Sequence, residues 1–204
     1  MAERAVESPE DVLALLRSTS DRLRRRLILA AWLNARLGEV GGRVAVVGGS
    51  ALEVYTRGGY ATADLDLVTV DRALVGEHLE SLGFRRDGRY WVCDDLDLLV
   101  EVPGEQLRIG GSPGDWDRAT SADVPGVGAA WIIGVEDLIV DRLLAAKYWH
   151  DEAALHWART LLAFWTLAPG IPRLDLQYLS DLARRELVDD VLALPEPGDE
   201  DRGP

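Results

Sequence analysis

The sequence predicts an α/β fold in which a small sheet flanked by helices is followed by a C-terminal helical portion. Over residues 1–133, short apolar runs of strand length alternate with helical segments, and Gly, Pro and Asp residues separate them. Over residues 134–194 the apolar pattern is helical throughout. We therefore expect an α/β core of residues 1–133, a helical portion of residues 134–194 packed on it, and a disordered tail over residues 195–204.

Apolar periodicity and turn residues place the individual elements. Helices are expected over residues 9–37, 51–57, 72–82, 135–149, 152–167, 175–184 and 186–194. Strands are expected over residues 44–47, 65–70, 96–102 and 131–133, with a hairpin of residues 84–86 and 90–92 that turns at Asp87-Gly88. Residues 104–128 are expected to form a loop with one short strand at most.

Composition indicates a soluble protein with one compact core, since the 204 residues are 48% hydrophobic and 28% charged. The chain does not begin with a basic segment and an apolar run, and no apolar run is long enough to span a bilayer. Neither a signal peptide nor a membrane partner is therefore expected, and the expected location is cytoplasmic. Cys93 is the single cysteine, which excludes an internal disulfide and a cysteine-rich metal site.

The net charge of −13 argues against duplex DNA as a partner, because proteins that hold long nucleic acids usually carry a basic surface. One basic cluster, formed by Arg22, Arg24, Arg25 and Arg26, falls within the first expected helix. We interpret it as a solvated face, with contact to RNA or to a partner as the alternative. The negative net charge weakly favours a cationic small substrate or a basic partner protein.

Asp64 and Asp66 stand two residues apart at the start of an apolar strand. Side chains alternate in a strand, so both carboxylates project from one face while Leu65 and Leu67 project from the other. Two carboxylates about 7 Å apart at Cα on a buried strand repel each other unless a cation lies between them. A pair of Mg²⁺ ions meets that need and can activate the oxygens of a phosphoryl transfer. The pattern therefore predicts a magnesium site.

Gly48, Gly49 and Ser50 lie where an expected strand passes into a helix. Glycines let the backbone approach a phosphate closely, and a helix N-terminus adds free N–H groups and a positive dipole end. The Ser50 hydroxyl could donate to the same phosphate, although capping of the helix is the more frequent role. The order of strand, Gly-Gly-Ser, helix and Asp-x-Asp is more informative than either motif alone.

This order resembles the signature of the polymerase-β-like nucleotidyltransferase superfamily: a hydrophobic residue, Gly-[Gly/Ser]-Ser, a short helix, then Asp-x-Asp. The resemblance implies a small mixed sheet of the nucleotidyltransferase type. It also implies that Gly48, Gly49 and Ser50 hold a nucleoside triphosphate and that Asp64 and Asp66 bind two Mg²⁺ ions.

A narrower resemblance concerns residues 62–68, whose sequence TADLDLV is similar to the short bacterial branch related to abortive-infection and toxin–antitoxin nucleotidyltransferases. The resemblance is specific over residues 44–70, looser over residues 71–150 and absent beyond. It implies a role beside a partner protein encoded nearby.

The superfamily usually supplies a third carboxylate from a later strand. Strand alternation puts Asp95, Asp97 and Glu101 on one face, so alternation alone does not identify the ligand. Asp95 is expected in the turn that enters the strand, which leaves Asp97 and Glu101 as candidates. We favour Glu101 as a metal ligand and catalytic residue because its apolar surroundings make an uncompensated charge costly and resemble a strand of the bacterial branch. Asp97 is the alternative.

The helix expected over residues 135–149 carries a polar stripe that ends with Lys147 and Asp151. One interpretation is an ordinary helix-stabilising ion pair between these two residues at i,i+4. The resemblance to the abortive-infection branch implies instead that Lys147 and Asp151 flank the nucleotide, with Lys147 neutralising phosphate charge. The sequence leaves both interpretations open.

Together these features predict a Mg²⁺-dependent nucleotidyltransferase that transfers an NMP from a nucleoside triphosphate to a hydroxyl acceptor. A protein side chain, a tRNA end and a small hydroxyl compound all remain open as that acceptor. The alternative hypothesis is a non-catalytic module with the same fold that acts as an antitoxin or binds a partner protein.

Overall fold

The computed structural model describes residue 6 and residues 8–167 and 173–193. The chain divides into two compact units. The α/β unit comprises Met1–Leu107 and Asp115–Ile133, and the helical unit comprises Arg108–Gly114 and Gly134–Pro204. The packing of the helical portion on the core stays a prediction, and the tail over residues 195–204 lies outside the described residues.

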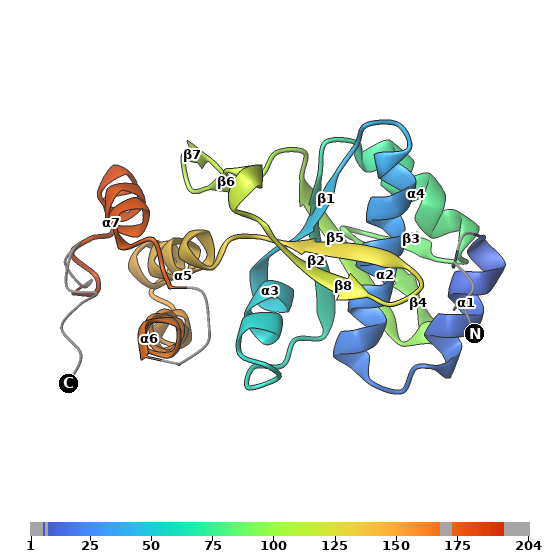
Figure 1. The fold of residues 1–204 in the computed structure, drawn as a ribbon, viewed down its shortest axis with the longest axis horizontal. Helices are drawn as coiled ribbons and strands as arrows, with labels where there is room; N and C mark the ends of the chain where they lie inside the picture. The colour runs from blue at the N-terminus through green and yellow to red at the C-terminus, as the bar shows by residue number, and fades with distance from the viewer. Residues whose placement is uncertain (1–5, 7, 168–172, 194–204) are drawn as a thin grey trace. The chain divides into compact units, whose positions relative to one another are not determined.

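The α/β unit is built on a seven-stranded sheet with the order β3-β4-β5-β2-β1-β9-β8 (Figure 1). In this sheet β1 runs parallel to β9 and β2 runs parallel to β5, whereas the other neighbours are antiparallel. The predicted α/β class with a mixed sheet is therefore confirmed. The strands are β1 (Val44–Val46), β2 (Asp64–Thr69), β3 (Arg85–Asp87), β4 (Tyr90–Cys93), β5 (Leu98–Gly104), β8 (Thr120–Val124) and β9 (Gly128–Ile132).

Helices cover both faces of this sheet. In Figure 1, α2 and α4 lie on one side of it and α3 lies on the other. Side chains on the α2 and α4 side are buried: Leu65 and Val100 are fully inaccessible, and Trp91 lies directly against Gly76 of α4. The helices of this unit are α1 (Pro9–Ser18), α2 (Arg22–Gly38), α3 (Gly48–Tyr55) and α4 (Arg72–Ser81), with 3₁₀ turns at Asp94–Leu96 (η1) and Trp116–Arg118 (η2).

The single helix expected over residues 9–37 is wrong, because α1 ends at Ser18 and α2 begins at Arg22. The Thr19 hydroxyl donates to the carbonyl of Leu15, and the Asp21 carboxylate accepts from the backbone N–H of Arg24 at 2.6 Å. Short polar side chains of this kind compete for backbone groups and cap helices. The break therefore follows from local capping.

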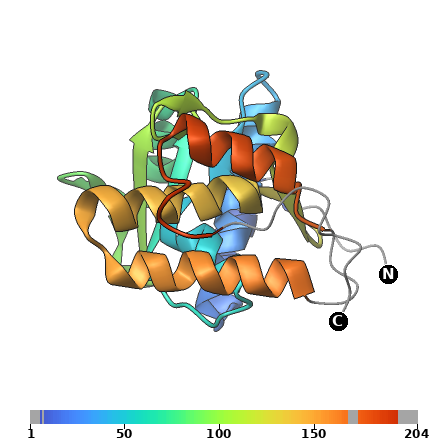
Figure 2. The ribbon, with the colours of Figure 1, turned by 90° about the vertical axis from the view of Figure 1, so that its left-hand side faces the viewer.

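In the helical unit, α5 (Val135–Trp149) matches the predicted residues at both ends, and α6 (Glu152–Leu167) begins at the predicted residue. Figure 2 shows α5 between α6 and α7 (Leu176–Arg185). Two short strands, β6 (Arg108–Ile109) and β7 (Ser112–Pro113), complete this unit as a hairpin. None of the helices described for either unit combines the length and the apolar character needed to cross a bilayer.

A last helix was expected over residues 186–194, and it is wrong for residues 186–193, the part that the structure describes. Leu187 adopts a left-handed backbone with φ of +58°, which ends a right-handed helix. The Glu186 carboxylate accepts from the N–H of Gly111 at 2.8 Å and from the Ser112 hydroxyl. This tertiary contact with the β6–β7 hairpin stabilises a turn where the apolar pattern favoured a helix.

Candidate metal centre

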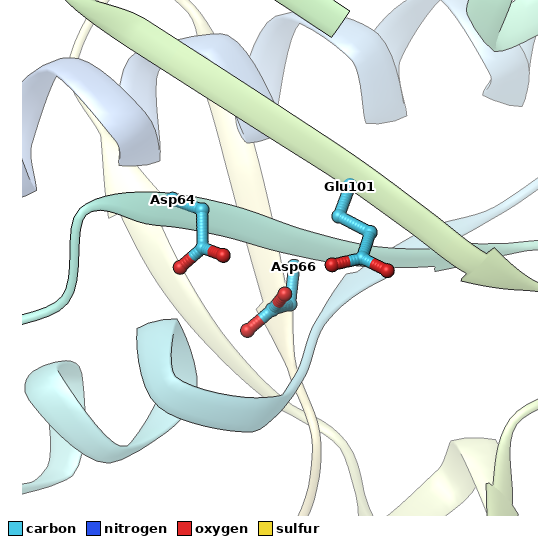
Figure 3. Close-up of side chains that lie close together, drawn as sticks. All are labelled: Asp64, Asp66 and Glu101. Atoms are coloured by element: carbon cyan, nitrogen blue, oxygen red, sulfur yellow. The ribbon is translucent and has the colours of Figure 1, made fainter. Parts of the chain in front are cut away.

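Three carboxylates gather on one face of the sheet. Because β2 and β5 are parallel neighbours with Asp66 opposite Glu101, both residues project to the same side as Asp64. One ligand oxygen from each of Asp64, Asp66 and Glu101 lies within 4.8 Å of the others. Figure 3 shows the three carboxylates extending from the two strands into one space. The predicted acidic pair is thus part of a three-carboxylate cluster.

The donor set of this cluster suits a hard divalent cation. Carboxylate oxygens are the ligands that Mg²⁺ prefers, and all three residues are only partly exposed, the Glu101 side chain to 16%. Carboxylates this close together and partly shielded from solvent repel each other, and a bound cation offsets that repulsion. The residues present therefore fit a magnesium site of one or two ions.

The structure separates the two candidates for the third carboxylate. Asp97 does not lie on a strand: it follows the 3₁₀ turn η1 with φ of +48°, and β5 begins at the next residue. Its carboxylate lies 2.5 Å from Nη2 of Arg22, and its side chain is 63% exposed. The alternation that put Asp97 on the same face as Glu101 fails because η1 interrupts the strand. Glu101 joins Asp64 and Asp66, and Asp97 does not.

The glycine turn lies against the acidic cluster, as the order of motifs predicted. Gly48 begins α3 with φ of +57°, and a Cβ at this position would lie 2.5 Å from Oδ2 of Asp66. The backbone N–H of Gly49 donates to the same oxygen at 3.1 Å. Only glycine combines this backbone conformation with such a close approach. The positive end of α3 is thereby brought to the carboxylates.

Ser50 makes a contact that the sequence did not predict. Its side chain is buried, and its hydroxyl donates to the backbone carbonyl of Asp64 at 2.7 Å. Ser50 thereby ties the first turn of α3 to the start of β2. A contact of Ser50 with a phosphate stays a prediction.

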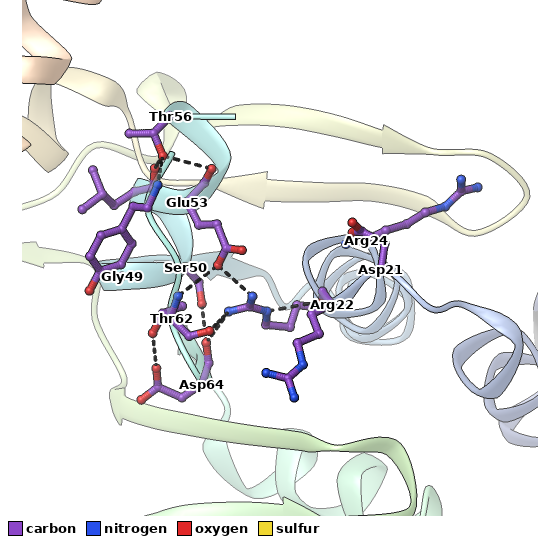
Figure 4. Close-up of polar contacts among 12 residues, drawn as sticks. Asp21, Arg22, Arg24, Gly49, Ser50, Glu53, Thr56, Thr62 and Asp64 are labelled. Atoms are coloured by element: carbon purple, nitrogen blue, oxygen red, sulfur yellow. Dashed lines mark hydrogen bonds and ion pairs between the residues drawn. The ribbon is translucent and has the colours of Figure 1, made fainter. Parts of the chain in front are cut away.

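A buried ion pair supports the backbone of Asp64, and Figure 4 shows Glu53, Thr62 and Asp64 close together. Arg26 on α2 is 3% exposed, and its guanidinium lies 2.7 Å from the Glu53 carboxylate on α3. The same guanidinium donates to the carbonyls of Thr62 at 3.1 Å and Asp64 at 3.0 Å. The Thr62 hydroxyl in turn donates to Oδ1 of Asp64 at 2.6 Å. These contacts position Asp64 in both main chain and side chain.

The interpretation of the arginine cluster as a solvated face is wrong for Arg26, although Arg22 and Arg24 are exposed. A signal for this burial was available in the sequence. Arg26, Leu33 and Leu37 fall on one stripe of α2, which is the stripe that faces the core. An arginine inside an apolar stripe requires a buried partner, and Glu53, between the apolar residues of α3, supplies it.

Sequence reasoning also missed Arg89. This residue lies in the hairpin between β3 and β4, and its Nε is 3.5 Å from Oε2 of Glu101. No spacing rule links the two residues, because β4 and β5 meet only in the folded sheet. The tertiary structure therefore adds a positively charged guanidinium to the rim of the acidic cluster.

Lys147 and Asp151 belong to the helical unit and make their contacts within it. Lys147 lies 2.6 Å from the Asp190 carboxylate and donates to the carbonyl of Leu187 at 2.5 Å. The hydrogen bond with Asp190 raises the pKa of Lys147. Asp151 accepts from the N–H of Ala154 at 3.0 Å and so caps α6. The ion pair of Lys147 is thus with Asp190 and not with Asp151, while a nucleotide-binding role for either residue stays a prediction.

No family model matches the sequence, and no curated protein matches it. The chain is similar to the crystal structure of an antigenic nucleotidyltransferase-like protein from Paracoccidioides brasiliensis. The identity is 18% and the TM-score 0.49, over 85% of this chain and 92% of that chain. At this low identity and TM-score the similarity establishes nothing about function, so a functional proposal has to stand on the side chains described above.

Proposed function

We propose that the protein is a Mg²⁺-dependent nucleotidyltransferase that transfers an NMP from a nucleoside triphosphate to a hydroxyl acceptor. The observation that carries this proposal is the cluster of Asp64, Asp66 and Glu101 within 4.8 Å, with the glycine-lined N-terminus of α3 directly beside it. A carboxylate cluster next to a helix N-terminus combines a cation site with a phosphate-accepting backbone.

In this proposal, different residues of the chain bind the metal ions, admit the phosphate and orient the acceptor hydroxyl. Asp64, Asp66 and Glu101 would hold the magnesium ions, which supply charge stabilisation to the phosphates and activate the acceptor hydroxyl when bound. Gly48 and Gly49 keep the start of α3 free of side chains, so that a phosphate can approach the positive end of the helix. Glu101, on the neighbouring strand, would orient the attacking hydroxyl.

The finer parts of the proposal rest on the sequence resemblance alone. These are the abortive-infection or toxin–antitoxin setting, a partner protein encoded nearby, and the identity of the acceptor. The alternative of a non-catalytic module with this fold predicts the same carboxylate cluster without transfer of a nucleotide. The two hypotheses therefore differ in one measurable reaction.

The decisive experiment incubates the full chain with each α-labelled nucleoside triphosphate, Mg²⁺ and a cell-lysate acceptor pool. We expect label to appear in an acceptor, or pyrophosphate to be released, only when Mg²⁺ is present. The double variant Asp64→Asn/Asp66→Asn should lose this activity. A matched control, Glu105→Gln/Asp123→Asn, removes the same charge from two exposed positions and should keep it. Equal behaviour of wild type and Asp64→Asn/Asp66→Asn with every nucleotide would overturn the proposal.

A further inference from the structure

Arg89 stands at the rim of the acidic cluster on a short hairpin. It follows Gly88, whose φ of +58° makes the turn between β3 and β4. The Arg89 side chain is 68% exposed, whereas that of Glu101, its ion-pair partner, is 16% exposed. The long, solvated side chain of Arg89 therefore extends from the hairpin toward the partly buried carboxylate of Glu101.

The guanidinium makes two contacts with Tyr90 besides its ion pair with Glu101. Nη2 of Arg89 donates to the Tyr90 hydroxyl, and the guanidinium carbon lies 4.7 Å from the centroid of the Tyr90 ring. The separation of 3.5 Å between Nε and Oε2 of Glu101 exceeds the roughly 2.7–2.9 Å of a charge-assisted hydrogen bond. Arg89 can thus give up its contact with Glu101 and keep its anchor on Tyr90.

The charge of the acidic cluster nevertheless reaches Arg89. The hydrogen bond with Tyr90 and then the negative charges of Glu101 and Asp64 raise the pKa of the Arg89 guanidinium. Arg89 stays protonated and supplies one positive charge to a group of three carboxylates. Glu101 is therefore shared between this guanidinium and any divalent cation that occupies the cluster.

We propose that Arg89 is a built-in, reversible counter-ion of the acidic cluster that competes with a divalent cation for Glu101. The proposal rests on the metal site of the proposed function. In the metal-free protein Arg89 offsets part of the repulsion among the carboxylates, and an incoming cation has to displace it from Glu101. Arg89 thereby raises the concentration of divalent cation that is needed to occupy the cluster.

The test is a titration of the full chain with Mn²⁺, without nucleotide, in which electron paramagnetic resonance measures the free ion. We expect Arg89→Gln to bind Mn²⁺ about three- to tenfold more tightly than wild type, because a screened repulsion between two cations is removed. Added salt should narrow this difference. Arg89→Lys, which keeps the charge, should stay within about twofold of wild type.

Arg86 provides the matched control. It lies on the same hairpin, is exposed, and packs over Trp91 on the other face of the sheet, 5.3 Å from the ring centroid. Arg86→Gln removes the same charge, and we expect its Mn²⁺ affinity to stay within about twofold of wild type. If Arg89→Gln binds Mn²⁺ no more tightly than wild type, or more weakly, Arg89 is no competitor and the inference is overturned.

The failure of the proposed function gives a different result. If wild type and Asp64→Asn/Asp66→Asn give the same Mn²⁺ titration, the cluster holds no metal, and both the metal site and the role of Arg89 are overturned. If Mn²⁺ binding responds to Arg89→Gln as expected but no nucleotide is transferred under any condition, the enzyme proposal fails and the counter-ion role stands.

Discussion

Replacement of Glu53 by glutamine removes the counter-charge of a buried arginine without changing the shape of the side chain. Glu53 is paired with Arg26, and the two side chains are 9% and 4% exposed. In the variant, the Arg26 guanidinium stays in the core with the backbone carbonyls of Arg22, Thr62 and Asp64 as its remaining partners besides the new amide. We expect this substitution to destabilise the protein and to loosen Asp64.

The magnitude follows from the burial of the pair. Loss of one partner of a buried ion pair costs about 3–5 kcal/mol, because the other charge stays buried without compensation. These backbone carbonyls and the glutamine oxygen still accept from Arg26, so the lower end applies, about 3 kcal/mol. For a chain of this size 1 kcal/mol shifts Tm by about 2–4 °C, so a decrease of about 6–12 °C is expected.

The assay is thermal and urea unfolding, followed by circular dichroism and by tryptophan fluorescence. Glu39→Gln is the control, because the Arg36–Glu39 pair has a similar N–O distance of 3.0 Å but Glu39 is 59% exposed. This control should cost less than about 0.5 kcal/mol. A loss below about 1 kcal/mol for Glu53→Gln would refute the reasoning, since it would mean that Arg26 finds solvent once its partner is neutral.

Three further predictions concern other positions. Gly48→Ala should lower the free energy of unfolding by about 1–3 kcal/mol and weaken Mn²⁺ binding, because its Cβ would lie 2.5 Å from Asp66 and its φ is +57°; unchanged urea unfolding and Mn²⁺ titration would contradict this. Glu101→Gln should weaken Mn²⁺ binding at least about tenfold whereas Asp97→Asn should leave it within about twofold, and the reverse order would restore Asp97 as the third carboxylate. Burial favours a higher pKa for Glu186, but hydrogen bonds from the β6–β7 hairpin outweigh it and hold the pKa below its usual value. The stability from this group is present above the unfolded pKa of about 4.3 and is lost as the pH falls through the lower folded value, so Glu186→Gln should flatten the acid limb of the stability curve measured by urea unfolding.

Local sequence patterns determined most of the secondary structure, because periodicity and capping act over a few residues. The helix α5 matches its predicted residues, α6 begins at the predicted residue, and the hairpin of β3 and β4 turns at Asp87-Gly88 as expected. Some expectations were wrong for local reasons and others for tertiary reasons. A cap at Asp21 divided an expected helix, whereas a tertiary contact of Glu186 replaced another helix with a turn. Residues 104–128 were expected to form a loop with one short strand at most, and they contain β6, β7 and β8.

The acidic pair with which the functional prediction began was also determined by the sequence. Alternation along one strand is enough to put Asp64 and Asp66 on one face, and this is a property of a short segment. The approach of α3 to them also needs the pairing of β1 with β2, while the left-handed Gly48 permits the close contact. The third carboxylate was not decided in this way, because counting residues from Asp97 to Glu101 assumes an uninterrupted strand, and η1 interrupts it.

The tertiary structure alone decided which charges meet. Arg26 and Glu53 lie on different helices, Arg89 and Glu101 lie on different strands, and no periodicity relates the members of either pair. The energy of an ion pair depends on the distance and solvent exposure of both groups, which exist only once the chain has folded. The sequence thus predicted a pair of carboxylates at a glycine turn, and the fold added the third carboxylate, the buried support of Asp64 and the counter-ion at the rim.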